Sequence, residues 1–171
     1  MLGLQNEREW RVFCERILAQ PELATDERFS SNSRRVENRE ILPALIVVAF
    51  DGIRPFHLAV PCAVFGEAAG AQPLFDLRVC AIEPGPLRTQ AGFTIVAAHG
   101  LRELERAQIV VVPSWRDAHE VPPAPLLAAL QRAHRRGAIV VGLCLGAFAL
   151  AAAGLLDGRP ATTDWRWSGL F

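Results

Sequence analysis

The residues best suited to chemistry form a G-x-C-x-G motif, from Gly142 to Gly146, with Cys144 at its centre. An apolar, β-branched run precedes the motif and an Ala-rich run follows it. A strand followed by a helix is the context in which G-x-S-x-G makes a nucleophile elbow, a strained turn that presents its central side chain. The glycines let strand and helix approach closely, and the unpaired N–H groups of the first helical turn favour a thiolate. We therefore predict an elbow; the alternative is a buried, inert cysteine.

The elbow needs a sheet to hold it. Short apolar runs predict strands at residues 45–50, 77–82, 109–113 and 138–143, with a short pairing strand at 93–96. Helices are predicted at residues 55–66, 125–136 and 145–153. Strands that alternate with helices predict an α/β fold with a doubly wound, mostly parallel sheet. Ligands of such folds bind at the carboxyl ends of the strands.

The stretch from Gly137 to Leu156 holds twenty residues without a charge, long enough for a membrane span. Its internal glycines divide it into a β-branched part and an Ala-rich part, which favours a buried strand, a turn and a buried helix instead. The first residues are charged by position 7 and have no apolar signal core. We expect a cytoplasmic protein without membrane contact.

Composition limits the class of protein. A length of 171 residues fits about one domain, and a chain with 51% hydrophobic and 21% charged residues is not disordered. The 18 basic residues, all Arg, balance 18 acidic ones, which argues against nucleic-acid binding by a broad basic surface. Neither the four cysteines nor the histidines have the spacing of a disulfide framework or a metal site. We expect reduced thiols, no metal and no cofactor.

Charge density changes near residue 42, since residues 1–41 hold 15 of the 36 charged side chains. We predict a helical segment at 1–42 and an α/β domain at 43–171. Asn6 and Glu9 form a capping pattern for a first helix that ends at Pro21. Its apolar face comprises Trp10, Phe13, Cys14, Ile17 and Leu18. A second short helix is predicted around Val36, ending before Pro43.

Residues 44–171 resemble the N-terminal domain of GlxA-type, AraC-family transcriptional regulators, a branch of the ThiJ/PfpI, class I glutamine-amidotransferase-like superfamily. The resemblance is carried by AFDGIRPFHLAVPCAVFGE, VCAIEPGPLRTQAGFTI, GLRELERAQIVVVPSW and RRGAIVVGLCLGAFALAAAGLLDGRPATTDW. It implies a flavodoxin-like sandwich, often dimeric, that senses a small molecule, followed by a pair of DNA-binding helix-turn-helix motifs. Since that domain continues with further strands in the family, the resemblance implies a C-terminally truncated copy without the DNA-binding part.

Residues 4–42 are similar to a stretch of family III (CaiB/BaiF-type) CoA-transferases. The similarity rests on a Q-N-x-x-x-W start, on P-E-L-A-x-D-x-R-F and on R-V-x-N-R. The aspartate that carries the acyl chemistry of those enzymes lies outside this stretch, so no residue takes that role here. The chain is therefore predicted to join a CoA-transferase fragment to a partial ThiJ/PfpI-like domain.

Four pocket positions depart from the pattern of the resembled regulators. Where GVxPFEL carries an acid that can bond the elbow thiol, this chain has His57, and the glycine of VVPGW is Ser114. The hydroxyl residue of the C-T-G elbow is Leu145, and the histidine of TTHW is Asp164. These exchanges change both the charge and the hydrogen bonding expected around the thiol.

Cys144, His57 and Asp164 nevertheless supply a thiol, a base and an orienting carboxylate, the types needed for nucleophilic catalysis. They are the candidate catalytic residues. The alternative is that His57 is a surface or helix-terminal residue and Asp164 caps a loop. The candidate ligand-binding residues are Cys144, Ser114, Trp115, Leu145, Gly146 and His57.

Three hypotheses for function follow. The first is a non-catalytic domain that senses a small molecule and pairs as a homodimer or with an intact homologue, without direct DNA binding. The second is a cysteine-dependent hydrolase or hydratase that uses Cys144. The third is a non-functional fusion remnant. Near the end of the sequence, Trp165, Arg166 and Trp167 resemble an aromatic-basic patch for nucleic acid, but we expect apolar surface that a further segment covers.

Overall fold

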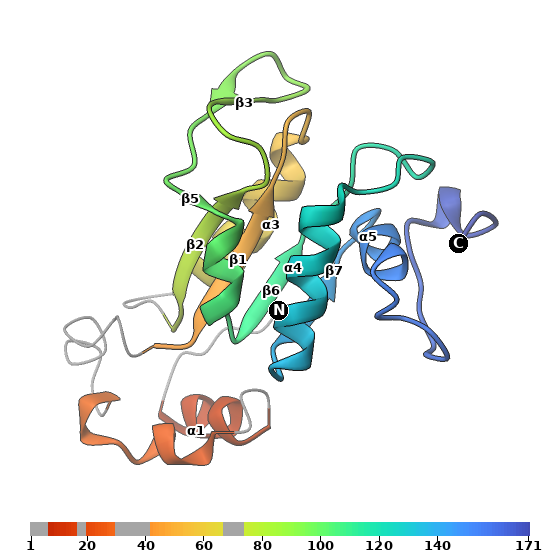
Figure 1. The fold of residues 1–171 in the computed structure, drawn as a ribbon. Helices are drawn as coiled ribbons and strands as arrows, with labels where there is room; N and C mark the ends of the chain where they lie inside the picture. The colour runs from red at the N-terminus through yellow and green to blue at the C-terminus, as the bar shows by residue number, and fades with distance from the viewer. Residues whose placement is uncertain (1–6, 17–19, 30–41, 67–73) are drawn as a thin grey trace. The chain divides into compact units, whose positions relative to one another are not determined.

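The computed structural model describes residues 7–16, 20–29, 42–66 and 74–171. The chain divides into two compact units, Met1–Pro43 with Ala63–Asp76, and Ala44–Cys62 with Leu77–Phe171. The second unit contains the elbow and most of the sheet (Figure 1).

A five-stranded sheet has the order β5-β2-β1-β6-β7. Its strands are β1 (Ala44–Ala49), β2 (Asp76–Ala81), β5 (His99–Gly100), β6 (Ile109–Val112) and β7 (Ile139–Gly142). The pairs β1/β6, β6/β7 and β2/β5 are all parallel. The prediction of an α/β fold with a mostly parallel, flavodoxin-like sheet is confirmed.

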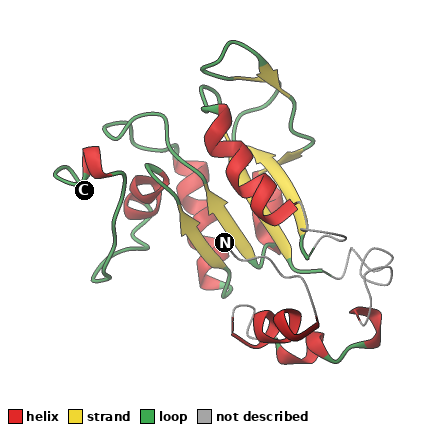
Figure 2. Ribbon diagram, turned by 180° about the vertical axis from the view of Figure 1, so that it is seen from behind, coloured by secondary structure: helices red, strands yellow, loops and turns green. Residues whose placement is uncertain are grey.

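The two central strands are the most deeply buried elements. Every residue of β1 and of β6 is buried. Helices cover both faces of the sheet, with α4 (Ala124–Arg135) and the 3₁₀ helix η4 (Leu101–Arg106) on one side and α3 (Pro55–Gly66) on the other (Figures 1 and 2). A strand covered on both faces needs apolar side chains in both directions, so it is an unbroken apolar run in the sequence.

The helices begin and end close to the predicted residues. α3 has the predicted bounds, and α4 is shifted by one residue. In α4, Leu126, Leu130 and Ala133 are buried at helical spacing, and Gly137 follows with a φ of 91°. The left-handed conformation at this glycine turns the chain out of the helix and into β7.

The uncharged stretch from Gly137 to Leu156 forms β7, a turn and the helix α5 (Gly146–Ala152). Within the described ranges, no helix is long and apolar enough to cross a membrane. The strand–turn–helix interpretation of this stretch is therefore confirmed.

A small hairpin and two short elements complete the second unit. β3 (Leu87–Arg88) pairs antiparallel with β4 (Thr94–Ile95), which confirms the short pairing strand predicted at 93–96. β5 and η4 were not predicted, because a two-residue strand and a short 3₁₀ helix are too brief to show a periodic pattern.

The first unit contains α1 (Glu7–Arg16) and the 3₁₀ helices η1 (Pro21–Ala24) and η2 (Glu27–Phe29). After α1, the Gln20 N–H donates to the Cys14 carbonyl at 2.9 Å, and Cys14 is buried. The predicted first helix is thus confirmed over 7–16. Its predicted cap Asn6, the positions of Ile17 and Leu18, and the helix predicted around Val36 lie outside the described residues.

The packing of Gly146 gives a test of this architecture. A Cβ added at Gly146 would overlap the Val112 carbonyl oxygen, a backbone atom that cannot move aside cheaply. We expect Gly146→Ala to lower the free energy of unfolding by roughly 3 kcal/mol or more. Urea unfolding, followed by far-UV circular dichroism and Trp fluorescence together, measures the change. Gly169→Ala is the control, because a Cβ there meets nothing; equal midpoints for the two variants would contradict the packing.

Candidate functional site

Cys144 occupies a strained turn between β7 and α5. Its φ is 51°, and it is the single non-glycine residue with a positive φ among the described residues. The Leu143 N–H donates to the Val112 carbonyl at 2.9 Å, which ties the turn to the end of β6. A Cβ at Gly142 would lie 2.9 Å from the Ala147 nitrogen, so strand and helix meet there too closely for a side chain. The two glycines are therefore steric requirements of the elbow.

A cavity of about 320 Å³ opens beside this turn. It is lined by Arg54, His57, Ser114, Trp115, Arg116, Asp117, Cys144, Leu145, Asp164, Arg166 and Trp167. The structure thus brings together all three candidate catalytic residues and five of the six candidate ligand-binding residues. Gly146 is the exception, since it is buried against β6 and does not line the cavity.

The Cys144 thiol has an acidic partner. Its Sγ lies 3.5 Å from Asp164 Oδ2, and the Thr163 hydroxyl donates to the Cys144 carbonyl at 2.9 Å. Arg166 holds the same carboxylate, with Nε 3.0 Å from Oδ1 and an Nη 2.7 Å from Oδ2, and its backbone N–H donates to Oδ1 at 3.0 Å. These bonds, those of the Arg166 side chain first, hold the pKa of Asp164 well below its usual range. Asp164 is therefore a carboxylate at neutral pH and a poor proton acceptor.

His57 lies in the first turn of α3 and is half-buried. Its Nδ1 is buried and has no hydrogen-bond partner among the described residues. Burial lowers the pKa of His57, and the Arg54 charge lowers it further, while Asp164 acts in the opposite direction. Within the described ranges, no hydrogen bond joins His57 to Cys144. The three candidate catalytic residues share a cavity, but hydrogen bonding links only Cys144 and Asp164.

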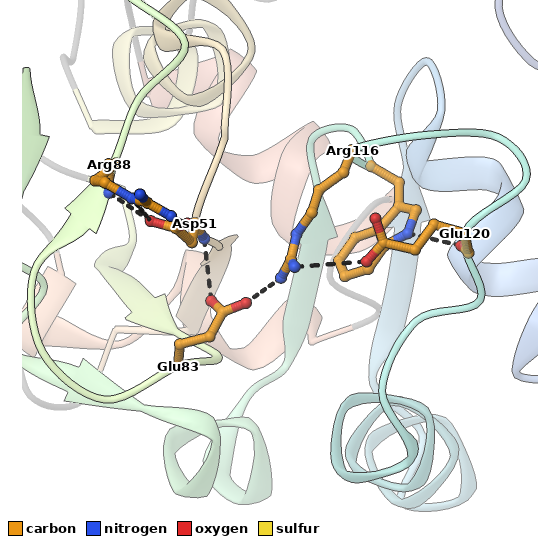
Figure 3. Close-up of polar contacts among 6 residues, drawn as sticks. Asp51, Glu83, Arg88, Arg116 and Glu120 are labelled. Carbon is orange, nitrogen blue, oxygen red and sulfur yellow. Dashed lines mark hydrogen bonds and ion pairs between the residues drawn. The ribbon is translucent and has the colours of Figure 1, made fainter. Parts of the chain in front are cut away.

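The wall after β6 is stiffened by aromatic and ionic contacts. Trp115 is buried, its indole N–H donates to the Glu120 carbonyl at 2.8 Å, and its ring centroid lies 4.9 Å from that of Phe50. The Arg116 guanidinium lies 5.0 Å from the Trp115 ring centroid and 5.7 Å from that of Phe50. It also pairs with Glu83 and, at 3.5 Å, with Glu120 (Figure 3).

The same ionic network extends to the loop after β1. The Asp51 N–H donates to Glu83 at 3.1 Å, and the Asp51 carboxylate pairs with Arg88 at 2.8 Å (Figure 3). The hydrogen bonds from Arg88, side chain first and backbone second, lower the pKa of Asp51 to about 2. Loops that follow β1, β2 and β6 are thus joined at one end of the sheet.

Sequence reasoning missed several residues of the cavity, namely Arg54, Arg116, Asp117, Arg166 and Trp167. Arg54 follows β1, and Arg116 and Asp117 follow β6, so the rule that sites form at the carboxyl ends of parallel strands could have found three of them. Trp167 contacts the His119 ring at 5.6 Å and lines the cavity. Trp165, in contrast, is 82% exposed.

The described residues contain no group of three or more His, Cys, Asp or Glu side chains placed to hold a metal ion. The cavity offers instead three guanidiniums, two carboxylates and an imidazole beside one thiol. Such a lining can bind and orient a small polar molecule.

Comparison with known proteins identifies the family. A model of the DJ-1/PfpI family matches residues 43–169, and the chain belongs to this family. The match covers the sheet, the elbow and every residue that lines the cavity. It begins at residue 43, so the similarity of residues 4–42 to CoA-transferases stays a prediction.

Two relatives in sequence and one solved structure are similar to this chain. The "uncharacterized protein in cpoL 5'region" of Streptomyces lividans is 33% identical over 123 residues, which cover 71% of this chain and 87% of that protein. The HTH-type transcriptional regulator CdhR of Pseudomonas aeruginosa is 32% identical over 93 residues, 54% of this chain and 27% of that protein. A Vibrio parahaemolyticus structure described as a transcriptional regulator superposes with a TM-score of 0.61 at 19% identity, covering 75% of this chain and 70% of that one. At that identity the superposition shows the fold alone.

The ion pair at the thiol gives a second test. In Arg166→Gln the side-chain bonds to Asp164 are lost, so we expect the pKa of Asp164 to rise towards its ordinary value near 3.9. A titration of the carboxyl carbon by NMR measures the shift. In the wild type the pKa of Asp164 is lower in the folded state than in the unfolded state. The ion pair with Arg166 therefore stabilises the folded state above about pH 4, and this stabilisation is lost as the pH falls towards the lowered pKa. Arg159→Gln, an exposed arginine that does not line the cavity, is the control; the same titration in both variants would contradict the assignment.

Proposed function

We propose that residues 43–171 form a non-catalytic, ligand-sensing domain that binds a small molecule in the cavity beside Cys144. The observation that carries this proposal is the state of the thiol's partner. Cys144 contacts a carboxylate that Arg166 keeps ionised, and that group cannot accept the thiol proton efficiently near neutral pH. The remaining candidate base, His57, has no hydrogen bond to the thiol within the described ranges.

The cavity itself supports a binding role. Its volume of about 320 Å³ suits a small metabolite, and its lining mixes charged groups with the apolar side chains of Leu145 and Trp167. Trp115 and Arg116 are held by several contacts each, so this wall is preorganised before a ligand arrives.

Similarity to CdhR, an HTH-type transcriptional regulator, supports a place in regulation for the sensing domain. We propose an AraC-type regulator origin, in line with the sequence motifs. DNA contact is not part of the proposal for these residues. The domain acts instead through ligand binding together with pairing, either as a homodimer or with a homologue.

A cysteine-dependent hydrolase or hydratase is the second candidate, and one specific observation favours it. Cys144 has the positive φ of a nucleophile elbow and shares its cavity with His57 and Asp164. If substrate binding moved His57 onto the thiol, the three residues would have the roles of nucleophile, base and orienting acid.

Alkylation of Cys144 separates the two candidates. If His57 does not activate the thiol, His57→Asn changes the rate of iodoacetamide labelling at pH 7 by no more than about twofold, whereas a working thiol–imidazole pair would lose roughly a hundredfold. Peptide mass spectrometry distinguishes Cys144 from the other three cysteines. His134→Asn, on the exposed side of α4, is the matched control. A large loss confined to the His57 variant would make the enzyme the better candidate.

The binding role has its own test. Isothermal titration of the 171-residue chain with amino-acid-derived and quaternary-ammonium metabolites should give saturable heat with at least one of them. A ligand that binds the folded state also raises the urea midpoint. At a ligand concentration of a hundred times its Kd, the free energy of unfolding increases by about 2.7 kcal/mol. Absence of heat and of stabilisation with every candidate would count against a sensing domain.

A further inference from the structure

The cavity wall carries three guanidiniums, and two of them are already paired. Arg116 contacts Glu83 and Glu120, and Arg166 contacts Asp164. Arg54 differs, because its side chain bonds to an amide: Nε donates to Gln90 Oε1 at 2.9 Å. No carboxylate contacts Arg54 within 7–16, 20–29, 42–66 and 74–171, and its terminal Nη groups are left for another acceptor.

His57 lies one helical turn after Arg54. The His57 N–H donates to the Arg54 carbonyl at 3.1 Å, so Arg54 and His57 stand three residues apart at the beginning of α3 and line the same cavity. His57 Nδ1 is buried and has no hydrogen-bond partner in the described part of the chain. His57 itself lines the cavity, so its imidazole, whose Nδ1 bonds to no described residue, is available to a ligand.

The charges around His57 define what that ligand should be. Arg54 at the start of α3 and Arg166 in the loop after α5 act on the imidazole as positive charges, and Asp164 acts as a negative one. Cys144 lines the same cavity from the elbow, and Asp117 lines it from the loop after β6. Since Arg166 and Asp164 neutralise each other, the uncompensated charge next to His57 is that of Arg54.

We propose that the cavity binds its ligand through a carboxylate, which Arg54 and His57 receive together, and that His57 takes up a proton as the carboxylate binds. This inference rests on the proposed ligand-binding function and names the chemistry of the ligand. A guanidinium presents parallel N–H groups that match the two oxygens of a carboxylate. The protonated imidazole has an N–H donor at each ring nitrogen, so the ring can add a charged donor to those of Arg54.

A carboxylate fits this pair of residues better than a phosphate. In the free protein the imidazole of His57 is neutral, and Arg54 is the uncompensated positive charge next to it. A carboxylate matches that single charge, whereas a phosphate monoester brings nearly two negative charges at pH 7. Asp117, which lines the same cavity, opposes a more highly charged anion. The apolar side chains of Leu145 and Trp167 are available for the uncharged part of the molecule.

The coupling to protons has a definite sign. In the free protein, burial and Arg54 lower the pKa of His57, so the imidazole is neutral at pH 7. A bound carboxylate raises that pKa, because an opposite charge favours the protonated form. Affinity therefore increases as the pH falls, by up to about tenfold per pH unit between the bound and the free values of the His57 pKa.

Matched pairs of probes test the proposal. Butyrate and benzoate are titrated into the 171-residue chain by calorimetry at pH 8 and pH 6, beside butyramide and benzamide, which have the same shape without the charge, and beside inorganic phosphate. We expect the carboxylates to bind with Kd values of about millimolar, more tightly at pH 6, and the amides not to bind. Repeating the titration in buffers of different ionisation enthalpy should show proton uptake at pH 7.

Variants assign the two contacts. Arg54→Gln should weaken carboxylate binding at least about tenfold. His57→Asn should keep binding measurable and abolish both the proton uptake and the difference between pH 6 and pH 8. Arg159→Gln, exposed and away from the cavity, should bind as the wild type does. Unchanged urea midpoints confirm that each variant is folded.

The outcomes separate this inference from the function on which it rests. Equal binding of amides and carboxylates, tighter binding of phosphate, or carboxylate binding that Arg54→Gln does not weaken would overturn the carboxylate site and leave a ligand-sensing domain intact. Absence of binding by any carboxylate up to about ten millimolar would overturn it as well. If the metabolite titrations also gave no heat, the sensing function itself would fail.

Discussion

The close approach of two backbones at one point determines most of the structure around the cavity. Gly146 packs directly on the Val112 carbonyl, and Gly142 packs on the backbone at the start of α5. β6 and β7 stay paired in parallel up to Val112 and Gly142. The chain therefore has almost no room to turn between the end of β7 and the start of α5. The turn is closed by a left-handed residue, and that residue is Cys144. The strain at the cysteine is therefore a consequence of how tightly the sheet and the helix pack.

The carboxyl ends of the strands bring the rest of the site to the same place. Asp51 follows β1, Glu83 follows β2 and Arg116 follows β6, and these three are joined in one hydrogen-bonded and ionic network. All three parallel strands deliver polar residues to one edge because their chains run in the same direction. Arg54 and His57, which follow Asp51 by a few residues, are brought to the cavity by the same arrangement.

The sequence predicted the elements more completely than the interactions. Fully buried strands such as β1 and β6 are visible as apolar runs, and α4 is visible from the spacing of its buried leucines. The elbow was predictable because Gly142 and Gly146 mark the two steric contacts. The ion-pair partners of the charged residues were not predictable. Arg116 pairs with Glu83, which lies 33 residues away in the sequence, and no local pattern indicates such a pairing. Gly146 shows the same limit: its place in the motif suggested a ligand contact, and the structure assigns it to packing.

The positions of the acid and the histidine explain why hydrogen bonds join the thiol to Asp164 and not to His57 within the described residues. The resembled regulators have an acid at position 57 and a histidine at position 164, and this chain has the reverse. The thiol keeps an acidic partner, now Asp164, but that carboxylate comes with Arg166 two residues away and is bound to it at both oxygens. The histidine, in turn, lies beside Arg54, whose charge opposes protonation of the imidazole. The acid thus becomes a weaker base, and Nδ1 of the imidazole has no hydrogen-bond partner in the described part of the chain. The exchange of the two residue types therefore leaves the acid bonded to the thiol and the histidine beside an arginine.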